Sequence, residues 1–227
     1  NSAGIRTNLG NQNIIVNSGA ITTSGPGSLG ILATGNSNNI SNSGSITTTG
    51  VADGATSADG IYSDGNSNTV TNSGSVISYF GKAIAFSGSG NILNLANSSF
   101  LGGVIDLGTG TQINIATAAN YSKLINYTGT LSGSITASGS VPAFINTSTN
   151  QVATYDPTIF SASSDALGDM TSTISSLTPT RFNGSDKDHP LWVRGFGMAS
   201  SYEGTDATLD RSYNYSGVAI GYDFKRS

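Results

Sequence analysis

The chain has 227 residues, one histidine, no cysteine, 10% charged residues and a net charge of −4. The acidic balance argues against nucleic-acid binding, which needs clustered Lys and Arg, and the lack of cysteine excludes disulfides and thiolate metal sites. Thirty glycines and long runs of Ser, Thr and Asn argue against a helical or α/β enzyme, while the Val, Ile and Leu content argues against disorder. The composition therefore predicts an all-β chain with many turns.

A repeat occupies the first hundred residues. The motif Gly-Asn-x-Asn begins at Gly10, Gly35 and Gly65, and a shorter Gly-Asn follows at Gly90, so the steps are 25, 30 and 25 residues. Seven residues after these glycines, an asparagine opens Asn-Ser-Gly or Asn-Ser-Ser, at Asn17, Asn42, Asn72 and Asn97. We expect the repeated asparagines at turns, where Asn tolerates the left-handed conformation and can hydrogen-bond along a stack.

Apolar residues fall into three columns of this repeat. The first column is Ile15, Ile40, Val70 and Leu95, the second is Ile21, Ile46, Val76 and Leu101, and the third is Ile31, Ile61 and Ile84, joined by Ile5. Three short apolar segments per period predict three strands in each coil, and stacked coils of this kind form a solenoid with the columns inside. We expect residues 1–105 to form about four coils of a right-handed parallel β-helix.

The 30-residue step contains five extra residues within Val51–Asp59. Insertions in solenoids form loops on one face, and such loops often bind ligands. Asp53, Asp59 and Asp64 put three carboxylates near this loop, which allows a weak cation site, but a solvated loop is the interpretation we favour. The sequence therefore assigns no metal, cofactor or catalytic residue.

Regularity fades after residue 105. Short strands are still predicted, at Thr111–Ile115, Ser122–Tyr127, Ser134–Ala137 and Ala143–Asn146. Because the terminal repeats of solenoids must cover the core, they depart from the repeat pattern. We expect residues 106–155 to be the C-terminal cap of the β-helix.

Residues 156–178 predict a linker helix. Asp156 is a suitable N-cap, and Pro157 suits the first helical position because its missing N–H costs nothing there. One narrow, mostly apolar stripe follows at helical spacing, and Pro179 ends the pattern. The stripe consists of Phe160, Ser163, Leu167, Met170, Ile174 and Leu177.

Two strands of about the length of tilted transmembrane strands are predicted near the end, at Leu191–Tyr202 and Tyr213–Phe224. Their side chains alternate, and because a charge on lipid is costly, we expect Arg194 and Asp223 to face the lumen of a barrel. Residues 203–212 predict a long polar loop. Outer-membrane barrels have long outer loops and short periplasmic turns, so the first strand should run from the periplasm to the exterior.

Three segments carry a family resemblance. Trp192-Val-Arg-Gly-Phe-Gly197 followed by Tyr215-Ser-Gly-Val-Ala-Ile-Gly-Tyr-Asp223 resembles the opening of the autotransporter β-domain. The stretch from Asp156-Pro-Thr to Asp165-Ala-Leu-Gly-Asp-Met-Thr171 resembles the segment that joins passenger to barrel in that family, which carries out type V secretion. The Asn-rich repeats are similar to passenger repeats. Together these segments cover most of the chain.

The resemblance implies a barrel of about twelve strands, with the helix in its lumen and the passenger domain outside the cell. Residues 179–227 would hold the first two strands of a truncated outer-membrane barrel, whose partners are the outer membrane and the barrel-assembly machinery. We therefore expect a fragment of a bacterial autotransporter, whose passenger is an adhesin or serves surface display. The expected location is the outer membrane for the barrel and the cell surface or extracellular space for the passenger. Because Asn1 lies inside a repeat, we interpret the missing signal peptide as truncation.

Two other functions remain open. A polysaccharide-active β-helix enzyme would need paired titratable groups, but residues 1–160 contain no glutamate or histidine, and His189 lies in the linker before the hairpin. We therefore expect no enzyme. A secreted structural or ice-binding β-helix is the alternative, because Thr22-Thr-Ser24 and Thr47-Thr-Thr49 offer hydroxyls on stacked strands, although Ile77-Ser-Tyr79 interrupts them.

Overall fold

The computed structural model describes a mostly β chain that divides into two compact units, Asn1–Tyr155 and Asp156–Ser227. The described residues are 2–8, 10–54, 57–119, 121–156, 158–177, 191–204 and 209–222.

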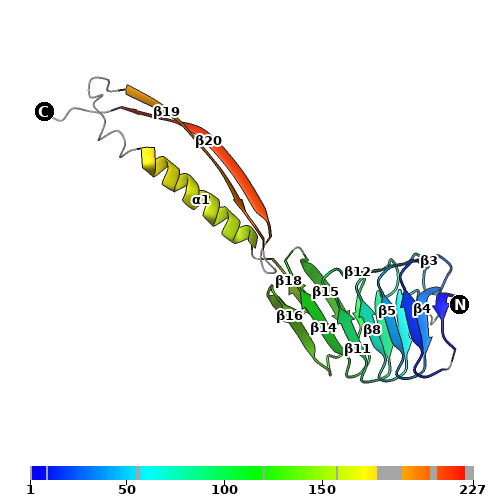
Figure 1. Ribbon diagram of the computed structural model, residues 1–227. Helices are drawn as coiled ribbons and strands as arrows, with labels where there is room; N and C mark the ends of the chain where they lie inside the picture. Colours follow the sequence, from blue (N-terminus) through cyan, green and yellow to red (C-terminus); the bar gives the residue numbers. More distant parts are fainter. Residues whose placement is uncertain are drawn as a thin grey trace. The chain divides into compact units, whose positions relative to one another are not determined.

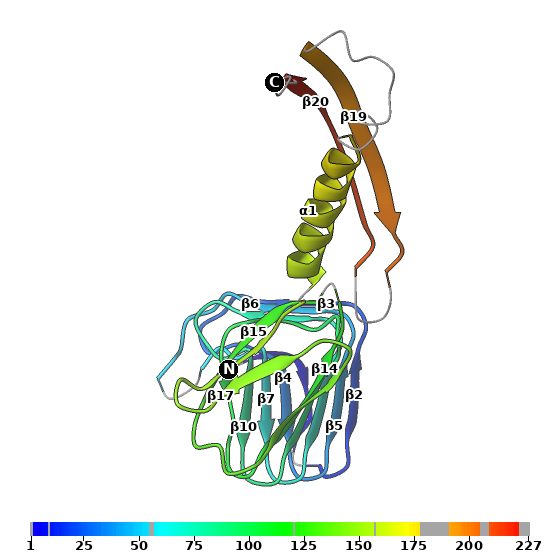
Figure 2. The same ribbon diagram turned by 90° about the vertical axis from the view of Figure 1, so that its left-hand side faces the viewer.

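Three sheets make up the first unit (Figures 1 and 2). In spatial order the first contains β1 (Ala3–Arg6), β4 (Leu29–Thr34), β7 (Ile61–Asp64), β10 (Ile84–Ser87), β13 (Ile105–Asp106), β15 (Lys123–Thr128), β18 (Gln151–Thr154) and β17 (Ala143–Asn146). The second contains β16 (Ile135–Gly139), β14 (Gln112–Thr117), β11 (Ile92–Leu95), β8 (Thr69–Asn72), β5 (Asn39–Asn42) and β2 (Ile14–Asn17). The third contains β12 (Phe100–Gly102), β9 (Ser75–Ser78), β6 (Ser45–Thr48) and β3 (Ala20–Thr23).

The chain visits these sheets in rotation. From β1 to β11, each strand pairs in parallel with the strand three places further along the chain. Figure 2 shows the strands of the three sheets around one interior. The parallel sheets are thus compatible with a β-helix, in which strands that are distant in sequence stack because each buries its inner side chains against its neighbours.

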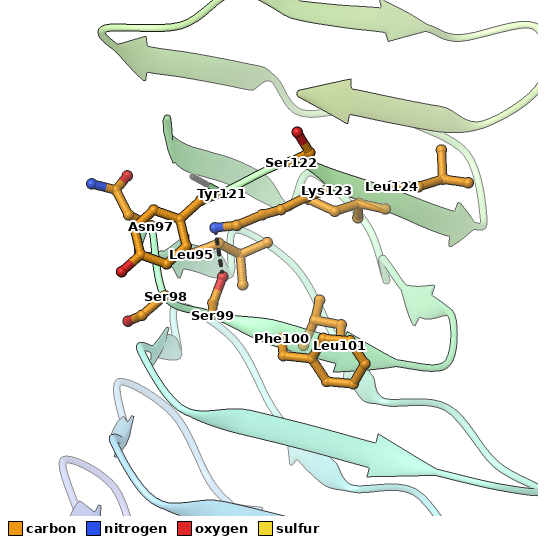
Figure 3. Close-up of a pocket in the computed structure, with 11 residues that line it drawn as sticks. Leu95, Asn97, Ser98, Ser99, Phe100, Leu101, Tyr121, Ser122, Lys123 and Leu124 are labelled. Carbon is orange, nitrogen blue, oxygen red and sulfur yellow. Dashed lines mark hydrogen bonds between the residues drawn. The ribbon is translucent and has the colours of Figure 1, made fainter. Parts of the chain in front are cut away.

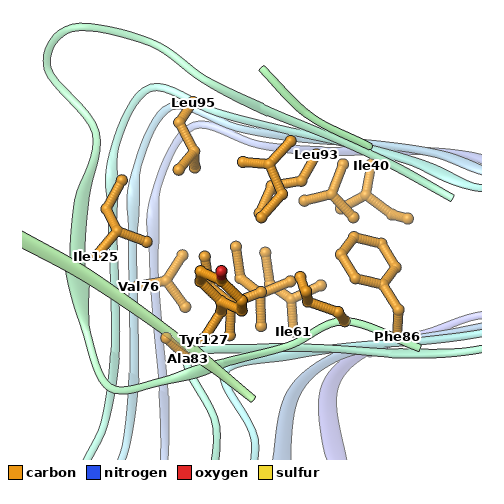
Figure 4. Close-up of a cluster of buried hydrophobic side chains, with 14 of the residues drawn as sticks. Ile40, Ile61, Val76, Ala83, Phe86, Leu93, Leu95, Ile125 and Tyr127 are labelled. Atoms are coloured by element: carbon orange, nitrogen blue, oxygen red, sulfur yellow. The ribbon is translucent and has the colours of Figure 1, made fainter. Parts of the chain in front are cut away.

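Two of the three predicted columns are confirmed by the strand register. Ile5, Ile31, Ile61 and Ile84 are successive partners in the first sheet, and Ile21, Ile46, Val76 and Leu101 are successive partners in the third. The column of the first sheet continues through Ile105 to Tyr127. Side chains from all three sheets point into one buried cluster (Figure 4). This shared core is what fixes the register of the stack.

The remaining column was predicted correctly for three members and wrongly for the fourth. Ile15, Ile40 and Val70 are partners, but Val70 pairs with Leu93, whereas Leu95 pairs with Asn72. The step at this point of the second sheet is 23 residues, and the neighbouring hydrogen bond from Asn68 N–H to Oδ1 of Asn91 spans the same number. The turn before β11 is as long as the turn before β8, and the turn after β11 is two residues longer than the turn after β8. The motif spacing at Gly90 and Asn97 therefore gave the wrong register.

Buried asparagines form a ladder through the second sheet. The Nδ2 of Asn17 donates to Oδ1 of Asn42 (2.8 Å), and the Nδ2 of Asn42 donates to Oδ1 of Asn72 (2.7 Å). All three side chains are buried, and the next position is taken by Leu95 rather than Asn97. The expected hydrogen bonding along the stack is thus confirmed for this column. Each side-chain amide forms a hydrogen bond with the next, which offsets the free-energy cost of burying these polar groups.

Replacing Asn42 by Ala should lower the free energy of unfolding by about 3 kcal/mol, because Asn72 Oδ1 loses its donor and a cavity remains. Chemical denaturation of the full chain measures the change. Asn39→Ala is the matched control, since Asn39 lies on the same strand with its side chain exposed. Equal losses in the two variants would contradict a structural role of the ladder.

In the turns, the left-handed conformation is adopted by the residue between the two asparagines of each Gly-Asn-x-Asn motif. Gln12, Ser37 and Ser67 have φ values of 59°, 56° and 56°. The asparagine on the N-terminal side instead uses its Oδ1 to accept the backbone N–H of the next coil, as Asn11 does from Asn36 (2.7 Å). The prediction that the repeat asparagines adopt this conformation is therefore wrong. Their side chains join coils, and this role does not require a positive φ.

The end of the first unit changes from parallel to antiparallel pairing. β13, β14, β15 and β16 still pair in parallel, so the stacking continues past residue 105. β18, which was not predicted, pairs antiparallel with both β15 and β17. Antiparallel pairs can be joined by short turns, so this return of the chain ends the stack.

The second unit consists of a helix and a hairpin. α1 (Thr158–Leu177) occupies the predicted helical segment, and β19 (Leu191–Tyr202) pairs antiparallel with β20 (Arg211–Tyr222). β20 begins two residues before the predicted strand, because the ladder extends to the pair Tyr202 and Arg211. Pro157, Pro179, Asp223 and Phe224 lie outside the described residues.

Candidate functional site

Polar side chains join the helix and the hairpin of the second unit, and we call this contact the helix–hairpin interface. Asp165, Asp169 and Thr173 are spaced by four residues and therefore lie on one face of α1. Figure 1 shows α1 running alongside β19 and β20. The hairpin supplies alternate residues of both strands, which share one face of the two-stranded sheet: Ser200, Tyr202, Arg211, Tyr213 and Tyr215.

The carboxylate of Asp169 is the centre of this interface. Its Oδ2 accepts hydrogen bonds from the hydroxyls of Tyr213, Tyr202 (3.2 Å) and Ser200 (3.4 Å). These bonds, led by that from Tyr213, lower the pKa of the Asp169 carboxyl below its usual value, although burial acts in the opposite direction. The carboxylate is therefore ionised at neutral pH and binds both strands to the helix.

Two further contacts lie one helical turn to either side. Asp165 Oδ2 accepts a hydrogen bond from Arg211 at 2.6 Å, and the guanidinium of Arg211 lies 4.6 Å from the centre of the Tyr202 ring. Toward the other end, the hydroxyls of Thr173 and Tyr215 are 2.7 Å apart. A planar guanidinium suits both a carboxylate and an aromatic face, so Arg211 joins the helix to the end of the hairpin.

The apolar stripe of the helix does not form this interface. Leu167 is 65% exposed, and Met170 and Ile174 are each 41% exposed. The hairpin face opposite the helix carries hydroxyls and a guanidinium, which pair with carboxylates and not with Leu or Met. The sequence identified the stripe correctly as apolar, but the opposite, polar face makes the contacts. The side chains of Phe160 and Leu177 lie outside the described residues.

The other face of the hairpin is apolar. Its exposed side chains are Leu191, Val193, Val218, Ile220 and Tyr222. The side chain of Arg194 lies on the polar face, in register with Ala219, and Asp223 lies outside the described residues. The alternation expected for the second strand is therefore present as far as Tyr222.

Trp192 and Phe196 share the polar face because glycines lie opposite them. Trp192 pairs with Gly221 and Phe196 with Gly217. A Cβ atom at Gly221 would lie 2.2 Å from the Trp192 ring, and one at Gly217 would lie 2.6 Å from the Phe196 ring. Each ring thus covers the backbone of a glycine on the other strand, an arrangement that stabilises glycine-containing sheets. This explains why the first strand alternates less cleanly than the second.

The three aspartates near the insertion do not form a cation site. Asp59 is buried, and its carboxylate accepts hydrogen bonds from the hydroxyl of Ser57 (2.5 Å) and the backbone N–H of Lys82 (2.7 Å). Asp53 is exposed, and among the described residues no group of three His, Cys, Asp or Glu side chains is arranged to hold a metal ion. Asp59 therefore anchors the end of the insertion to the segment before β10, whereas residues 51–54 are exposed, as expected of a solvated loop.

The predicted array of stacked hydroxyls is short. Thr22 and Thr47 are partners on stacked strands, but the next partner is Ile77, so this column of hydroxyls ends after two strands. His189 lies outside the described residues. Sequence reasoning missed the roles of Asp165, Asp169 and Thr173, whose spacing of four residues was the available signal.

No helix in the described part of the chain combines the length and apolar character needed to cross a membrane. Comparisons with known protein families, with curated proteins and with solved structures found nothing that matches this chain.

Proposed function

We propose that the chain is part of a bacterial autotransporter. In this proposal residues 1–155 are the last coils and cap of a right-handed parallel β-helix passenger, α1 is the linker, and β19 and β20 are the first two strands of an outer-membrane barrel. The passenger serves adhesion or surface display and lies at the cell surface, and the barrel is inserted with the barrel-assembly machinery.

The observation that carries this proposal is the division of the hairpin into two faces. One face exposes Leu191, Val193, Val218 and Ile220, and the other binds a helix through hydroxyls and charges. A soluble hairpin would bury its apolar face against its own core. A barrel strand does the opposite, because lipid surrounds the apolar side and the polar side lines the lumen.

Strand length and number also support a barrel. Each strand has twelve residues, close to the roughly 9–11 that a tilted strand needs to cross a bilayer. An isolated two-stranded hairpin is at best marginally stable, and its open edges would be costly in lipid. Further strands on both edges of the hairpin would satisfy these backbone groups.

The proposed adhesive or display role rests on the first unit. Its sequence contains few charged residues, and among the described residues no group of three His, Cys, Asp or Glu side chains is arranged to hold a metal ion. A stack of coils offers a long lateral surface, which suits binding to other surfaces more than it suits chemistry on a small substrate.

The complete coding sequence tests the proposal most directly. We expect about ten further segments of alternating hydrophobicity, each near ten residues long, after Ser227. A continuation without such segments would exclude the barrel and, with it, the autotransporter.

The hairpin topology gives a prediction for the complete protein in cells. Residues 203–210 join the two strands and are expected outside, so a cysteine replacing Glu203 should be labelled by an impermeant maleimide in intact cells. The matched control is Lys225→Cys, which follows the second strand in the sequence and should be labelled only after the outer membrane is permeabilised. The reverse pattern would show that the strands run in the opposite direction.

A further inference from the structure

The first unit contains a pocket of about 240 Å³ at the edge of its third sheet. β12 is the last strand of that sheet, and the chain reaches β15 through a turn beside it. Its lining comes from two segments of the chain, within residues 95–101 and 121–125 (Figure 3). Ligand pockets usually measure roughly 300–1,000 Å³, so this one suits a single ring-sized group.

Among the described residues that line the pocket, Lys123 is the one cation and none is acidic. Lys123 Nζ donates to the carbonyl of Ala96 and to the hydroxyl of Ser99 (3.1 Å), which leaves one of its three N–H groups for a ligand. Figure 3 shows the Lys123 side chain extended along the pocket with Nζ directed at Ser99. Half-burial lowers the pKa of Lys123 to about 8 because the charged ammonium loses water. An anion in the pocket would compensate this charge.

The pocket also has hydroxyl groups at its rim. Ser98 and Ser122 are exposed, and both belong to the lining. A serine hydroxyl can donate a hydrogen bond to a ligand hydroxyl or accept one from it. The pocket therefore suits a ligand that carries hydroxyls as well as an anionic group.

Apolar faces complete the pocket. Phe100 is 57% exposed and Tyr121 is 42% exposed, and both rings belong to the lining. Aromatic side chains with one exposed face bind flat, partly apolar groups, and the hydroxyls of Ser98 and Ser122 lie at the same rim. The required ligand thus combines a carboxylate, hydroxyl donors and a ring with an apolar face.

We propose that this pocket binds an acidic sugar, with the carboxylate on the ammonium of Lys123, ring hydroxyls on Ser98 and Ser122 and the ring against Tyr121. The ligand class is that of uronic acids, either free or at the end of a polysaccharide. The proposal concerns the first unit alone and does not depend on the autotransporter assignment.

Glucuronate, glucose and acetate added to the full 227-residue chain test the proposal, followed through the backbone amide shifts of residues 97–101 and 121–125. We expect saturable shifts with glucuronate and at least tenfold weaker binding of glucose, which lacks the carboxylate, and of acetate, which lacks the ring. Glucuronate should also raise the pKa of Lys123 toward its ordinary value. Equal binding of acetate and glucuronate would overturn the sugar assignment.

Variants distinguish glucuronate binding in the pocket from binding elsewhere on the surface. Lys123→Met keeps most of the apolar stem and should weaken glucuronate binding at least tenfold, and Ser122→Glu should do the same by placing a negative charge at an exposed position of the rim. Lys82→Met is the matched control, because it removes a cation of the same unit that does not line the pocket. Unchanged binding in folded Ser122→Glu, or equal loss in Lys82→Met, would refute the site. A tenfold advantage of polymeric glucuronate over the monosaccharide would identify a polysaccharide end as the source.

Discussion

Replacing Ile40 by Asp will lower the free energy of unfolding of the first unit by about 4 kcal/mol or more. Ile40 is fully buried between Ile15 and Val70 of the neighbouring strands. The change removes apolar burial, and it places a carboxylate in a core cluster whose other members are apolar apart from the Tyr127 hydroxyl. Chemical denaturation of the full chain, followed by far-ultraviolet circular dichroism, measures the shift in midpoint.

Two companion variants keep this result interpretable. Asn39→Asp adds the same charge at the exposed neighbouring position and should change stability by no more than about 0.5 kcal/mol. If Ile40→Asp does not fold, Ile40→Val should still cost about 1 kcal/mol, because one methylene is lost from a closed site. Similar midpoints for Ile40→Asp and Asn39→Asp would mean that the column does not lie inside.

Replacing Gly44 by Ala should cost about 3 kcal/mol, which is the usual scale of overpacking against a rigid neighbour. A Cβ atom at Gly44 would lie 2.0 Å from the carbonyl oxygen of Gly19, and Gly74 meets Gly44 in the same way. The neighbour is backbone and cannot rotate away. Adjacent coils would have to separate at this turn, which would disturb the bond from Ser45 N–H to Gly19 (2.9 Å).

The same column contains a matched control. Gly19 lies at the outer end of the stacked turns, and a Cβ atom there would meet nothing within 4 Å. Gly19→Ala should therefore leave stability unchanged within about 1 kcal/mol, since alanine also restricts the unfolded chain. Thermal unfolding of both variants compares the two positions. Equal losses of stability in the two variants would show that the backbone at Gly44 does not approach the Gly19 carbonyl oxygen this closely.

The helix–hairpin interface was only partly predictable from the sequence. The positions of the helix and of both strands follow from local patterns, namely a stripe at helical spacing and alternation with a period of two. Which face of the helix meets the hairpin does not follow from these patterns. Asp165, Asp169 and Thr173 make the contact because the strand residues opposite them carry hydroxyls and a guanidinium, and those residues are about 30 to 50 positions away in sequence.

The pocket around Lys123 was not predictable. Its lining comes from two segments, 95–101 and 121–125, which neither share a motif nor stand out in composition. The lowered pKa of Lys123 depends on burial, and burial exists only after the chain has turned beside β12. A lysine in a sequence of low charge does not by itself indicate a binding site.

The repeated three-strand period and most of the buried columns follow from the sequence, because inward side chains must recur wherever one coil stacks on the next. The register of the fourth coil follows instead from the folded chain, where Leu93 and not Leu95 continues the Ile40 column. The step there is 23 residues in the second sheet, because the turn before β11 keeps its length and the two extra residues lie in the turn after it. Turns tolerate such changes of length, while a buried strand does not. The core, and not the spacing of glycines and asparagines, therefore sets which residues pair.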